Sequence, residues 1–363
     1  MNLNIIAREA GVTAMTVSRV LRGQNLGQRR DAKGRAERIC AIAERLKYRR
    51  NMGPITLATG RFNSVGILES TEWHRNYLPA ARKQGIQDAL RKHRMNLMIF
   101  RVSDQELSDD RHVPETFRNW MVDGFLIDYI VAYPARLDAL IRRYALAAIW
   151  MNSKHAADCV FPADREGAQE AVDLLVKLGH RRIAYQHYLA GGGSPVHYSI
   201  ADRLSGYQRA MRRAGLKPEI IAVPPAQAYR DKLAFYVAQL RGTDPPTALI
   251  TSGLPDALAV VRAASAAGLR IPEDLSIITV ADDLTFTRAL RITAMEVPEY
   301  EVGYKAVECL MRKMAAPGED LPPLQVPLKF DGKEFCLPPQ TDAMVKISRR
   351  RRGGAKADKR GVR

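Results

Sequence analysis

The sequence of 363 residues has few of the features that mark several common protein classes. Its four cysteines, Cys40, Cys159, Cys309 and Cys336, are scattered and form no CxxC pair, which argues against a disulfide framework or a cysteine metal site. Its seven histidines show no HExxH spacing, so we expect neither a metal nor a cofactor. No run of about 18 uncharged apolar residues occurs. The N-terminus also lacks the pattern of a signal peptide, which is a basic segment followed by an apolar one. We therefore expect no membrane span and no export.

Motifs for phosphate binding and for nucleophilic catalysis are also absent. The sequence contains no GxGxxG, no GxxxxGK[ST] and no GxSxG. A glycine-rich run at residues 190–198 is not followed directly by a helical pattern, so it is interpreted as a flexible loop. We predict no catalytic residue, and we expect the chain not to be an enzyme.

Positive charge is present in excess, and it is concentrated at the two ends. The net charge is +17. Residues 1–61 hold 13 basic and 4 acidic residues, and residues 343–363 hold 9 basic residues and 1 acidic residue. The remaining residues, 62–342, hold 34 of each kind. Two basic ends around a neutral body indicate a polyanion partner for the ends and a different role for the middle.

The first 22 residues have the pattern of two helices joined by a tight turn. Apolar residues at helical spacing mark the first helix: Leu3, Ile6, Ala7 and Ala10. Gly11 is expected to end that helix, and Thr13 is expected to cap the second one. Val17, Val20 and Leu21 then face inward. The outward residues are Ala14, Met15, Thr16, Ser18, Arg19 and Arg22.

Such a pair can place the N-terminal residues of its second helix in the major groove of DNA. We expect Ala14 and Met15 to contact thymine methyl groups, and Thr16 and Ser18 to bind phosphate. Arg19 would bind guanine or phosphate. On the pattern alone, a plain helical hairpin that packs on another part of the chain stays possible.

The string IAREAGVTAMTVSRVL, residues 6–21, resembles the N-terminal signature of the lactose-repressor (LacI) family of bacterial transcription regulators. The family pattern is roughly V-A-x-x-A-G-V-[ST]-x-x-T-V-S-R-x-L-N, and Ile5 and Arg22 stand where the family usually has Asp and Asn. In the family, the two residues after the Ser/Thr read bases, and here these are Ala14 and Met15. The resemblance implies an all-α helix-turn-helix domain over residues 1–50.

A third helix is predicted at residues 34–48, followed by a hinge at residues 51–61. Leu57 falls where the family drives a leucine into the minor groove. Gly53 and Pro54 are poor helix formers, so a short hinge helix and a plain linker both stay possible. The predicted DNA-binding residues are Thr13, Ala14, Met15, Thr16, Ser18, Arg19, Arg22, Asn51 and Leu57.

The neutral body alternates between strand and helix patterns. Strands are predicted at residues 64–70, 95–102, 123–130, 145–152, 181–188, 247–251 and 275–282, and helices at residues 78–93, 165–179 and 255–268. This alternation predicts an α/β class with two lobes, each a parallel doubly wound sheet, and a ligand cleft at the carboxyl ends of the strands. Successive landmarks over residues 3–340 resemble the family's effector domain, which is similar to periplasmic binding proteins.

The resemblance implies effector-binding residues one by one: Asn76, Asn152, Arg203 and Asp282. Arg203 could instead form an ion pair that bridges the lobes, and Asp282 could be a turn residue. We add Trp73 and Tyr77, because aromatic rings beside a pocket loop can stack on an apolar ligand face, although core or surface roles are equally open.

One family landmark is changed. Where the family has ANDxxA, this sequence reads SGLPDALA at residues 252–259, so Gly253 and Leu254 replace an Asn-Asp pair. We expect Ser252 and Pro255 to begin the following helix. One polar effector contact is lost, which predicts an atypical ligand or a weakened site.

The body is predicted to end at residue 342, and the basic tail 343–363 is predicted to be disordered. The tail either attracts DNA without sequence preference or only solubilises the chain. We expect a cytoplasmic, nucleoid-associated homodimer that binds a pseudo-palindromic double-stranded operator, acts as a repressor and responds to a sugar or related metabolite. The alternatives are a DNA-binding regulator with a non-sugar or lost effector site, and a solute-binding protein.

Overall fold

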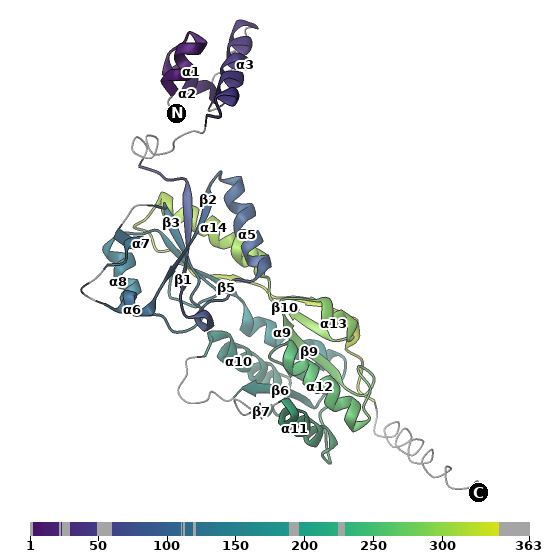
Figure 1. Cartoon of the computed structure of the whole chain (residues 1–363). Coiled ribbons are helices and arrows are strands. Elements are labelled where there is room, and N and C mark those ends of the chain that lie inside the picture. Colours follow the sequence, from purple (N-terminus) through teal and green to yellow (C-terminus); the bar gives the residue numbers. More distant parts are fainter. Residues whose placement is uncertain are drawn as a thin grey trace. The chain divides into compact units, whose positions relative to one another are not determined.

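The computed structural model describes residues 3–21, 23, 30–48, 60–109, 111, 113–118, 121–188, 196–223 and 229–340. The chain divides into two compact units, Met1–Phe62 and Asn63–Arg363 (Figure 1). Most of the predicted hinge and the whole predicted tail lie outside the described residues. None of the helices in the described ranges is long and apolar enough to cross a membrane.

The described residues of the N-terminal unit form three helices: α1 (Leu3–Ala10), α2 (Ala14–Leu21) and α3 (Arg30–Arg45). Gly11 follows α1 with a φ of 66°, a left-handed conformation that glycine adopts without strain. Thr13 caps α2, because its Oγ1 accepts a hydrogen bond of 3.2 Å from the backbone N–H of Thr16. Both predictions for this turn are confirmed.

The apolar stripes of these helices meet in one small core: Ile6, Ala7, Ala10, Val17, Ile39, Ile42 and Ala43. The bounds predicted for the third helix, residues 34–48, were wrong. The helix begins earlier because Gly34 is tolerated inside it at a cost of about 1 kcal/mol, which the burial of Ala36 and Ile39 offsets. It ends at Arg45 because Lys47 adopts a left-handed φ of 48°.

The second unit contains two lobes, each built on a six-stranded sheet. The first sheet has the order β11-β5-β4-β3-β1-β2, and all of its neighbouring strands are parallel. Its strands are β1 (Ser64–Ser70), β2 (Asn96–Val102), β3 (Gly124–Ile127), β4 (Ala148–Met151), β5 (Cys159–Pro162) and β11 (Leu324–Val326). Apolar residues of β1, β3, β4 and β5 are buried on both faces of the sheet, as expected for a parallel sheet between helices, whereas the edge strand β2 is largely exposed.

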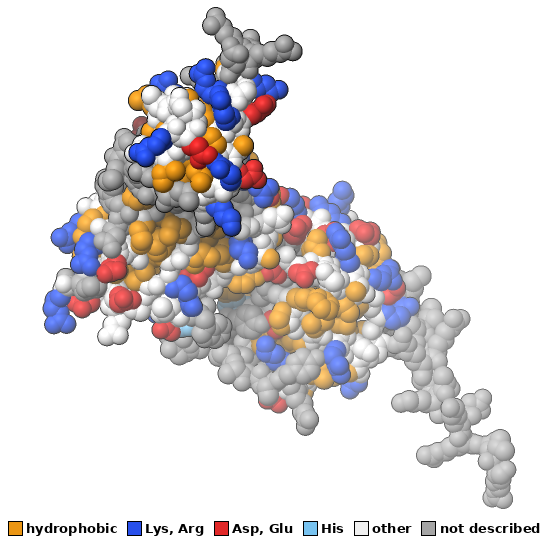
Figure 2. Space-filling model, turned by 45° about the horizontal axis from the view of Figure 1, so that its top comes forward, with side chains coloured by type: hydrophobic (Ala, Val, Ile, Leu, Met, Phe, Trp, Pro, Cys, Tyr) orange, Lys and Arg blue, Asp and Glu red, His pale blue; other side chains and the backbone are white. Residues whose placement is uncertain are grey.

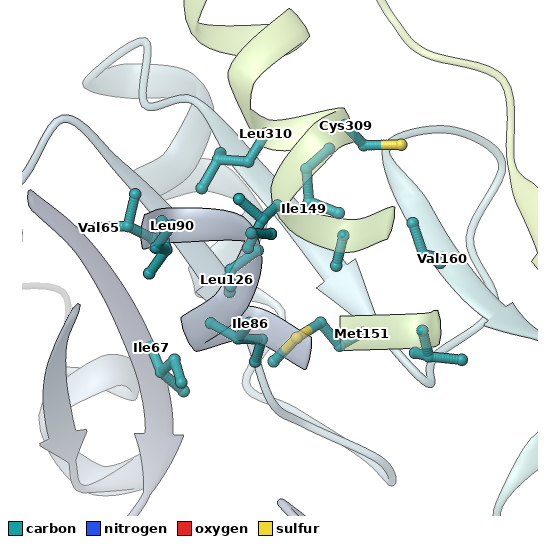
Figure 3. Packing of buried hydrophobic residues seen from close by; sticks show 14 of the residues in the cluster. Val65, Ile67, Ile86, Leu90, Leu126, Ile149, Met151, Val160, Cys309 and Leu310 are labelled. Atoms are coloured by element: carbon teal, nitrogen blue, oxygen red, sulfur yellow. The ribbon is translucent and has the colours of Figure 1, made fainter. Parts of the chain in front are cut away.

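Helices cover both faces of the first sheet. On one face, α5 (Ala80–Lys92) and α14 (Glu299–Ala315) bury the apolar cluster shown in Figure 3. On the other face lie α6 (Asp104–Ser108), α7 (Glu115–Arg118) and α8 (Arg136–Arg143). A short 3-10 helix, η1 (Trp73–Arg75), lies in the connection between β1 and α5.

The second sheet has the order β12-β10-β9-β8-β6-β7. Its strands are β6 (Ile183–Tyr188), β7 (Glu219–Val223), β8 (Ala248–Thr251), β9 (Ser276–Ala281), β10 (Thr293–Glu296) and β12 (Lys329–Asp331). All neighbours are parallel except β12, which runs antiparallel to β10. The prediction of a purely parallel sheet was wrong at this edge. Only two residues separate the end of β11 at Val326 from the start of β12 at Lys329. The chain therefore enters the second sheet at the edge where its parallel strands end, and β12 runs in the opposite direction to them.

The second lobe also has helices on both faces of its sheet. Those on one face are α9 (Asp164–Lys177) and α10 (Tyr198–Arg213), and those on the other are α11 (Tyr229–Arg241) and α12 (Leu254–Ala267). Two short helices, α13 (Thr285–Ala289) and η2 (Lys333–Phe335), complete the lobe. The chain passes between the lobes after β5, after β10 and between β11 and β12, so the carboxyl ends of both sheets face one another.

In each lobe one helix pair crosses at a glycine. A Cβ atom on Gly85 of α5 would lie 2.1 Å from the carbonyl oxygen of Tyr300 in α14. A Cβ atom on Gly206 of α10 would lie 2.2 Å from the carbonyl oxygen of Arg165 in α9. Only glycine allows these approaches, and they bring the first turn of α14 and of α9 against the neighbouring helix.

Candidate functional site

The N-terminal unit exposes the face of α2 that was predicted to read DNA. The described residues of the predicted set lie on α2 or at its cap: Thr13, Ala14, Met15, Thr16, Ser18 and Arg19. Met15 is 64% exposed, although the next apolar residue of the helix, Val17, is fully buried. The hydroxyls of Thr13 and Thr16 lie 3.0 Å apart and are hydrogen-bonded. The other predicted residues, Arg22, Asn51 and Leu57, lie outside the described residues.

The second unit contains a cavity of about 330 Å³ between its lobes, which suits a small metabolite. Its walls come from segments at the carboxyl ends of strands in both sheets, as expected for an α/β fold. The lining residues are Tyr77, Ile130, Asn152, Pro162, His197, Ser199, Arg203, Ser252, Gly253, Leu254, Pro255, Val280, Ala281, Asp282, Asp283, Val297 and Glu299.

Four of the residues predicted to bind an effector line this cavity. Tyr77 and Asn152 come from the first lobe, and Arg203 and Asp282 come from the second. The backbone of Trp73 lies in η1, but its side chain is outside the described part of the structure. The cavity therefore combines polar side chains from sequence positions that are far apart.

Asn76, the remaining predicted residue, has a different place. Its Oδ1 accepts a hydrogen bond of 2.8 Å from the backbone N–H of Ser70, and its Nδ2 donates to the carbonyl oxygen of Ser70 at 2.7 Å. The side-chain amide thus ties the loop to the end of β1, and Asn76 is not among the lining residues. The effector contact expected at Asn76 stays a prediction, and in this structure its amide binds the backbone of β1.

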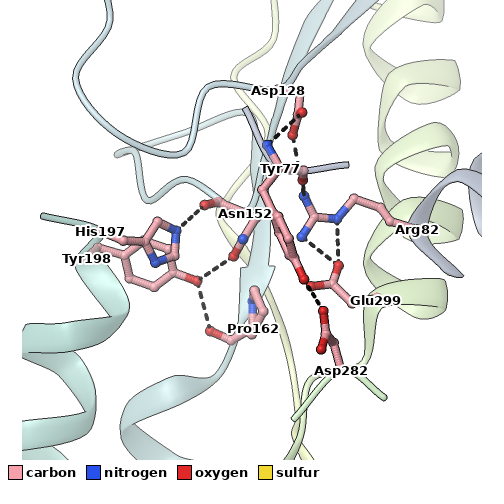
Figure 4. A network of polar contacts seen from close by, with 9 residues as sticks. All are labelled: Tyr77, Arg82, Asp128, Asn152, Pro162, His197, Tyr198, Asp282 and Glu299. Atoms are coloured by element: carbon pink, nitrogen blue, oxygen red, sulfur yellow. Dashed lines mark hydrogen bonds and ion pairs between the residues drawn. The ribbon is translucent and has the colours of Figure 1, made fainter. Parts of the chain in front are cut away.

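A buried arginine supports the cavity wall from the first lobe. Arg82 of α5 is fully buried, and its Nε donates to Glu299 at the start of α14 over 2.7 Å (Figure 4). Its Nη1 donates to the carbonyl oxygen of Tyr77 at 2.8 Å and lies 3.4 Å from Asp128. Burial raises the pKa of Asp128 to about 6 against the opposing effect of Arg82, and burial likewise raises the pKa of Glu299. The cluster fixes the backbone of Tyr77.

Tyr77 connects the two lobes. Its hydroxyl donates a hydrogen bond to Asp282 Oδ2, which follows β9 in the second lobe (Figure 4). Its backbone N–H donates to Asp128 Oδ2 at 3.1 Å. Burial and the hydrogen bond to Asp282 raise the pKa of Tyr77, so its hydroxyl keeps its proton at neutral pH.

A second polar group lies on the opposite wall. His197 Nε2 faces the carbonyl oxygen of Asn152 at 2.8 Å, and its Nδ1 lies 2.8 Å from Ser199 Oγ. A carbonyl oxygen can only accept, so Nε2 carries the proton. Burial lowers the pKa of His197, which keeps the ring neutral. The hydroxyl of Tyr198 donates to Asn152 Oδ1 at 3.3 Å (Figure 4). This hydrogen bond uses the oxygen of the Asn152 amide and not its Nδ2.

The second lobe supplies an arginine to the cavity itself. Arg203 Nε donates to Asp164 Oδ1 at 2.6 Å, and Asp164 is the first residue of α9. The side chain of Arg203 is 11% exposed and that of Asp164 is 1% exposed. The sequence left open whether Arg203 contacts a ligand or forms an ion pair that bridges the lobes. In the structure Arg203 forms an ion pair and also lines the cavity. However, the pair lies within the second lobe and does not bridge the lobes.

The changed landmark at residues 252–259 also lines the cavity. Ser252 donates from its backbone N–H to Gln186 Oε1 at 2.8 Å and from its hydroxyl to the carbonyl oxygen of Gln186 at 3.0 Å. Gly253 occupies the cap position of α12 without a side-chain hydrogen bond, and Pro255 lies in the first turn. The expectation that Ser252 begins the helix was wrong, because its hydroxyl is bound to β6.

Several residues of the site were not predicted: Arg82, Asp128, Asp164, His197 and Glu299. One sequence signal could have indicated the two arginine pairs. The pattern R-x-x-G occurs at residues 82–85 and again at residues 203–206, on helices that follow the first strand of each sheet. Within the described ranges, no group of three or more His, Cys, Asp or Glu side chains could hold a metal ion.

A helix-turn-helix unit followed by a two-lobed, cleft-containing α/β unit defines the class of DNA-binding proteins with a periplasmic-binding-protein-like body. Residues 2–51 match the profile of bacterial regulatory proteins of the lacI family, and residues 172–330 match that of the periplasmic binding protein-like domain. The chain is 26% identical to catabolite control protein A of Priestia megaterium over 92% of this chain and 99% of that protein. It is also 26% identical to the ribose operon repressor of Haemophilus influenzae, over 87% and 92% of the two chains.

Solved structures agree on the fold. The Lac repressor dimer bound to operator and the anti-inducer ONPF matches with a TM-score of 0.71 at 18% identity, over 93% of this chain and 99% of that chain. The chain belongs to the LacI family, and it is a DNA-binding transcription regulator.

Proposed function

We propose that this regulator is a repressor whose affinity for its operator is set by a small molecule bound between the lobes. The observation that carries the proposal is the cavity, which takes Tyr77 and Asn152 from one lobe and Arg203 and Asp282 from the other. A ligand that contacts both walls stabilises one arrangement of the lobes over others. That preference can bias operator binding, typically through a coupling free energy of about 1–3 kcal/mol.

We further propose that α2 reads the operator. The thioether of the exposed Met15 and the partly exposed methyl group of Ala14 suit thymine methyl groups, and the hydroxyls of Thr16 and Ser18 suit phosphates. Thr13 and Arg19 flank this surface, and Arg22, Asn51 and Leu57 complete the proposed contacts. A homodimer on a pseudo-palindromic site follows from the small surface of one module, and the operator-bound Lac repressor dimer supports it.

The proposed domain limits are residues 1–50 for DNA binding, 51–61 for the hinge, 62–342 for effector binding and dimerisation, and 343–363 for a basic tail. The division of the chain between Phe62 and Asn63 supports the proposed boundary between the hinge and the effector-binding domain. A cellobiose complex of the regulator CelR has a similar fold, with a TM-score of 0.57 at 20% identity, and it supports a metabolite in the cavity.

Selection of bound sequences from a random DNA pool tests the reading of DNA by α2. We expect two symmetry-related half-sites for the wild-type chain and a changed base preference within each half-site for Ala14→Gln. Glu37→Gln, which places the same side chain on the exposed surface of α3, is the control and should select the wild-type sequence. If Ala14→Gln also selected the wild-type sequence, Ala14 would not contact bases.

A further inference from the structure

The cavity has more negative than positive charge in its walls. The charged lining residues are Arg203, Asp282, Asp283 and Glu299, one base against three carboxylates. We propose that its ligand is a small polyhydroxylated molecule that carries a protonated amine, and that the amine lies against Asp282. The inference rests on the effector-binding role proposed above and adds the charge class of the effector.

Arg203 gives the cavity hydrogen-bond donors without an unbalanced positive charge. Its Nε is 2.6 Å from Asp164, a carboxylate with a side chain only 1% exposed, so the pair is close to neutral as a unit. Among the described residues, no hydrogen bond involves the two Nη groups of Arg203. These groups can donate to a ligand hydroxyl, and a negatively charged acceptor is not needed to balance them.

Arg82, the base behind the wall, is outnumbered by its partners. It is bonded to Glu299 and lies 3.4 Å from Asp128, so one guanidinium faces two buried carboxylates. The pKa of Glu299 is raised first by its burial, and the nearby charges of Asp282 and Asp164 add to the effect. The carboxylates around the cavity therefore repel one another, which a bound cation would relieve.

The negative charge that no base balances lies on two carboxylates at the mouth of the cavity. Asp282 accepts the hydrogen bond from Tyr77, and Asp283 accepts a bond of 2.8 Å from the backbone N–H of Thr285. Across the described ranges, neither has a basic ion-pair partner, and both are exposed. The chain between β6 and α10 at residues 189–195, like residues 224–228, contains no charged residue that could balance them.

An ammonium group matches this corner better than the other ligand groups do. It can donate to Asp282 as the Tyr77 hydroxyl now does, and its charge strengthens the hydrogen bond. A hydroxyl could make the same bond without the charge. A phosphate or carboxylate would lie beside like charges and would be repelled. Hydroxyl groups elsewhere on the ligand would meet the Nη groups of Arg203 and the polar atoms of Ser252 and His197.

Isothermal titration calorimetry of the full chain tests the charge class directly. The probes are matched sets that differ in one group: glucose, glucosamine and glucose 6-phosphate; galactose, galactosamine and galactose 6-phosphate; and mannose, mannosamine and mannose 6-phosphate. We expect the tightest binder to be an amine, with an affinity at least about tenfold above that of its neutral counterpart, which corresponds to about 1.4 kcal/mol. Added salt should weaken the binding of the amine more than that of the neutral sugar.

Variants locate the amine. Asp282→Asn keeps the shape of the side chain and removes its charge, so it should lower the affinity for the amine about tenfold and that for the neutral counterpart less than about threefold. Asp173→Asn is the control, because Asp173 pairs with Arg213 on the outer surface and does not line the cavity. It should leave both affinities unchanged.

The outcomes separate the two levels of the proposal. If the tightest binder is neutral or phosphorylated, or if Asp282→Asn weakens the amine no more than its neutral counterpart, the assignment of a cationic ligand is overturned and the effector role stands. If no member of any set binds, both the ligand class and the effector role are overturned.

Discussion

The two lobes use the same pair of features in different ways. In the first lobe, α5 contains Arg82 and Gly85, and the arginine binds the first residue of α14, Glu299. In the second lobe, α10 contains Arg203 and Gly206 with the same spacing, and the arginine binds the first residue of α9. Both α14 and α9 begin where the chain has just crossed from the other lobe.

The difference between the two pairs lies in what their guanidinium groups face. Arg82 is fully buried and surrounded by protein acceptors, whereas Arg203 is 11% exposed and lines the cavity. The same helix crossing thus gives a fixed support in one lobe and a ligand-facing donor in the other. We expect the first pair to determine mainly stability and the second to determine mainly ligand binding.

The largest expected effect comes from removal of the buried guanidinium. Arg82→Met leaves two carboxylates buried without their base, which should lower the free energy of unfolding by about 3–5 kcal/mol. Arg203→Met should cost less, because its site is open to the cavity. Urea unfolding measures both. Arg213→Met, at an exposed pair, is the control with an expected change within about 0.5 kcal/mol. If Arg82→Met lowered the free energy of unfolding no more than the control does, the Arg82 pair would not have the stabilising role that distinguishes it from the Arg203 pair.

The two helix crossings should be equally intolerant of a methyl group. Gly85→Ala and Gly206→Ala each place a Cβ atom within 2.2 Å of a backbone carbonyl oxygen, so each should lower stability by about 1–3 kcal/mol or more. Gly34→Ala in α3, where a Cβ atom would meet nothing within 4 Å, should be neutral or slightly stabilising. Thermal unfolding compares the three, and an unaffected Gly206→Ala would show that α9 and α10 do not need the close approach.

Asp128, the second buried carboxylate beside Arg82, should make the stability of the chain depend on pH. The pKa of Asp128 is raised to about 6 in the folded chain, against about 3.9 in an unfolded one. Between these values the folded state binds more protons, so the contribution of Asp128 to stability is present below about pH 4 and is lost as the pH rises through 6. Asp128→Asn should remove this slope, on the order of 1–3 kcal/mol, while Asp173→Asn retains it. Identical slopes in both variants would contradict the assignment.

The smallest expected effect on stability comes from a conservative change in the second pair. Arg203→Lys keeps a positive charge beside Asp164 but loses the two Nη groups of this cavity-lining side chain. It should lower the affinity for the tightest ligand of the sugar sets about tenfold and change the free energy of unfolding by less than about 1 kcal/mol. Calorimetry with the Arg213→Lys variant as control measures this, and an unchanged affinity would remove Arg203 from the ligand site.

Much of the fold could be predicted because its signals are local. The cap at Thr13, the turn at Gly11 and the buried strands β1 (Ser64–Ser70) and β9 (Ser276–Ala281) each depend on a few neighbouring residues. The antiparallel β12 could not be predicted in the same way. Its three residues carry no distinct pattern, and its direction follows from where the chain crosses between the lobes.

The candidate site was predictable only in part for a similar reason. Arg203 and Asp282 occupy positions that resemble those of the family, but the partners of Arg82 lie 46 and 217 residues away in the chain. No local pattern connects such residues. The hydrogen bonds of Asn76 could not be predicted either, because a matching position in the sequence does not reveal that the amide is bound to the backbone of β1.

The measurement that tests the central claim most directly is the operator affinity of the full chain with and without a saturating cavity ligand. The operator comes from the selection experiment, and the ligand is the tightest binder of the sugar sets. A LacI-family regulator that works as proposed should change its operator affinity about 5–150-fold on saturation, and Arg203→Lys should need a higher ligand concentration for the same change. An operator affinity that stays the same while calorimetry shows the cavity to be filled would contradict the account.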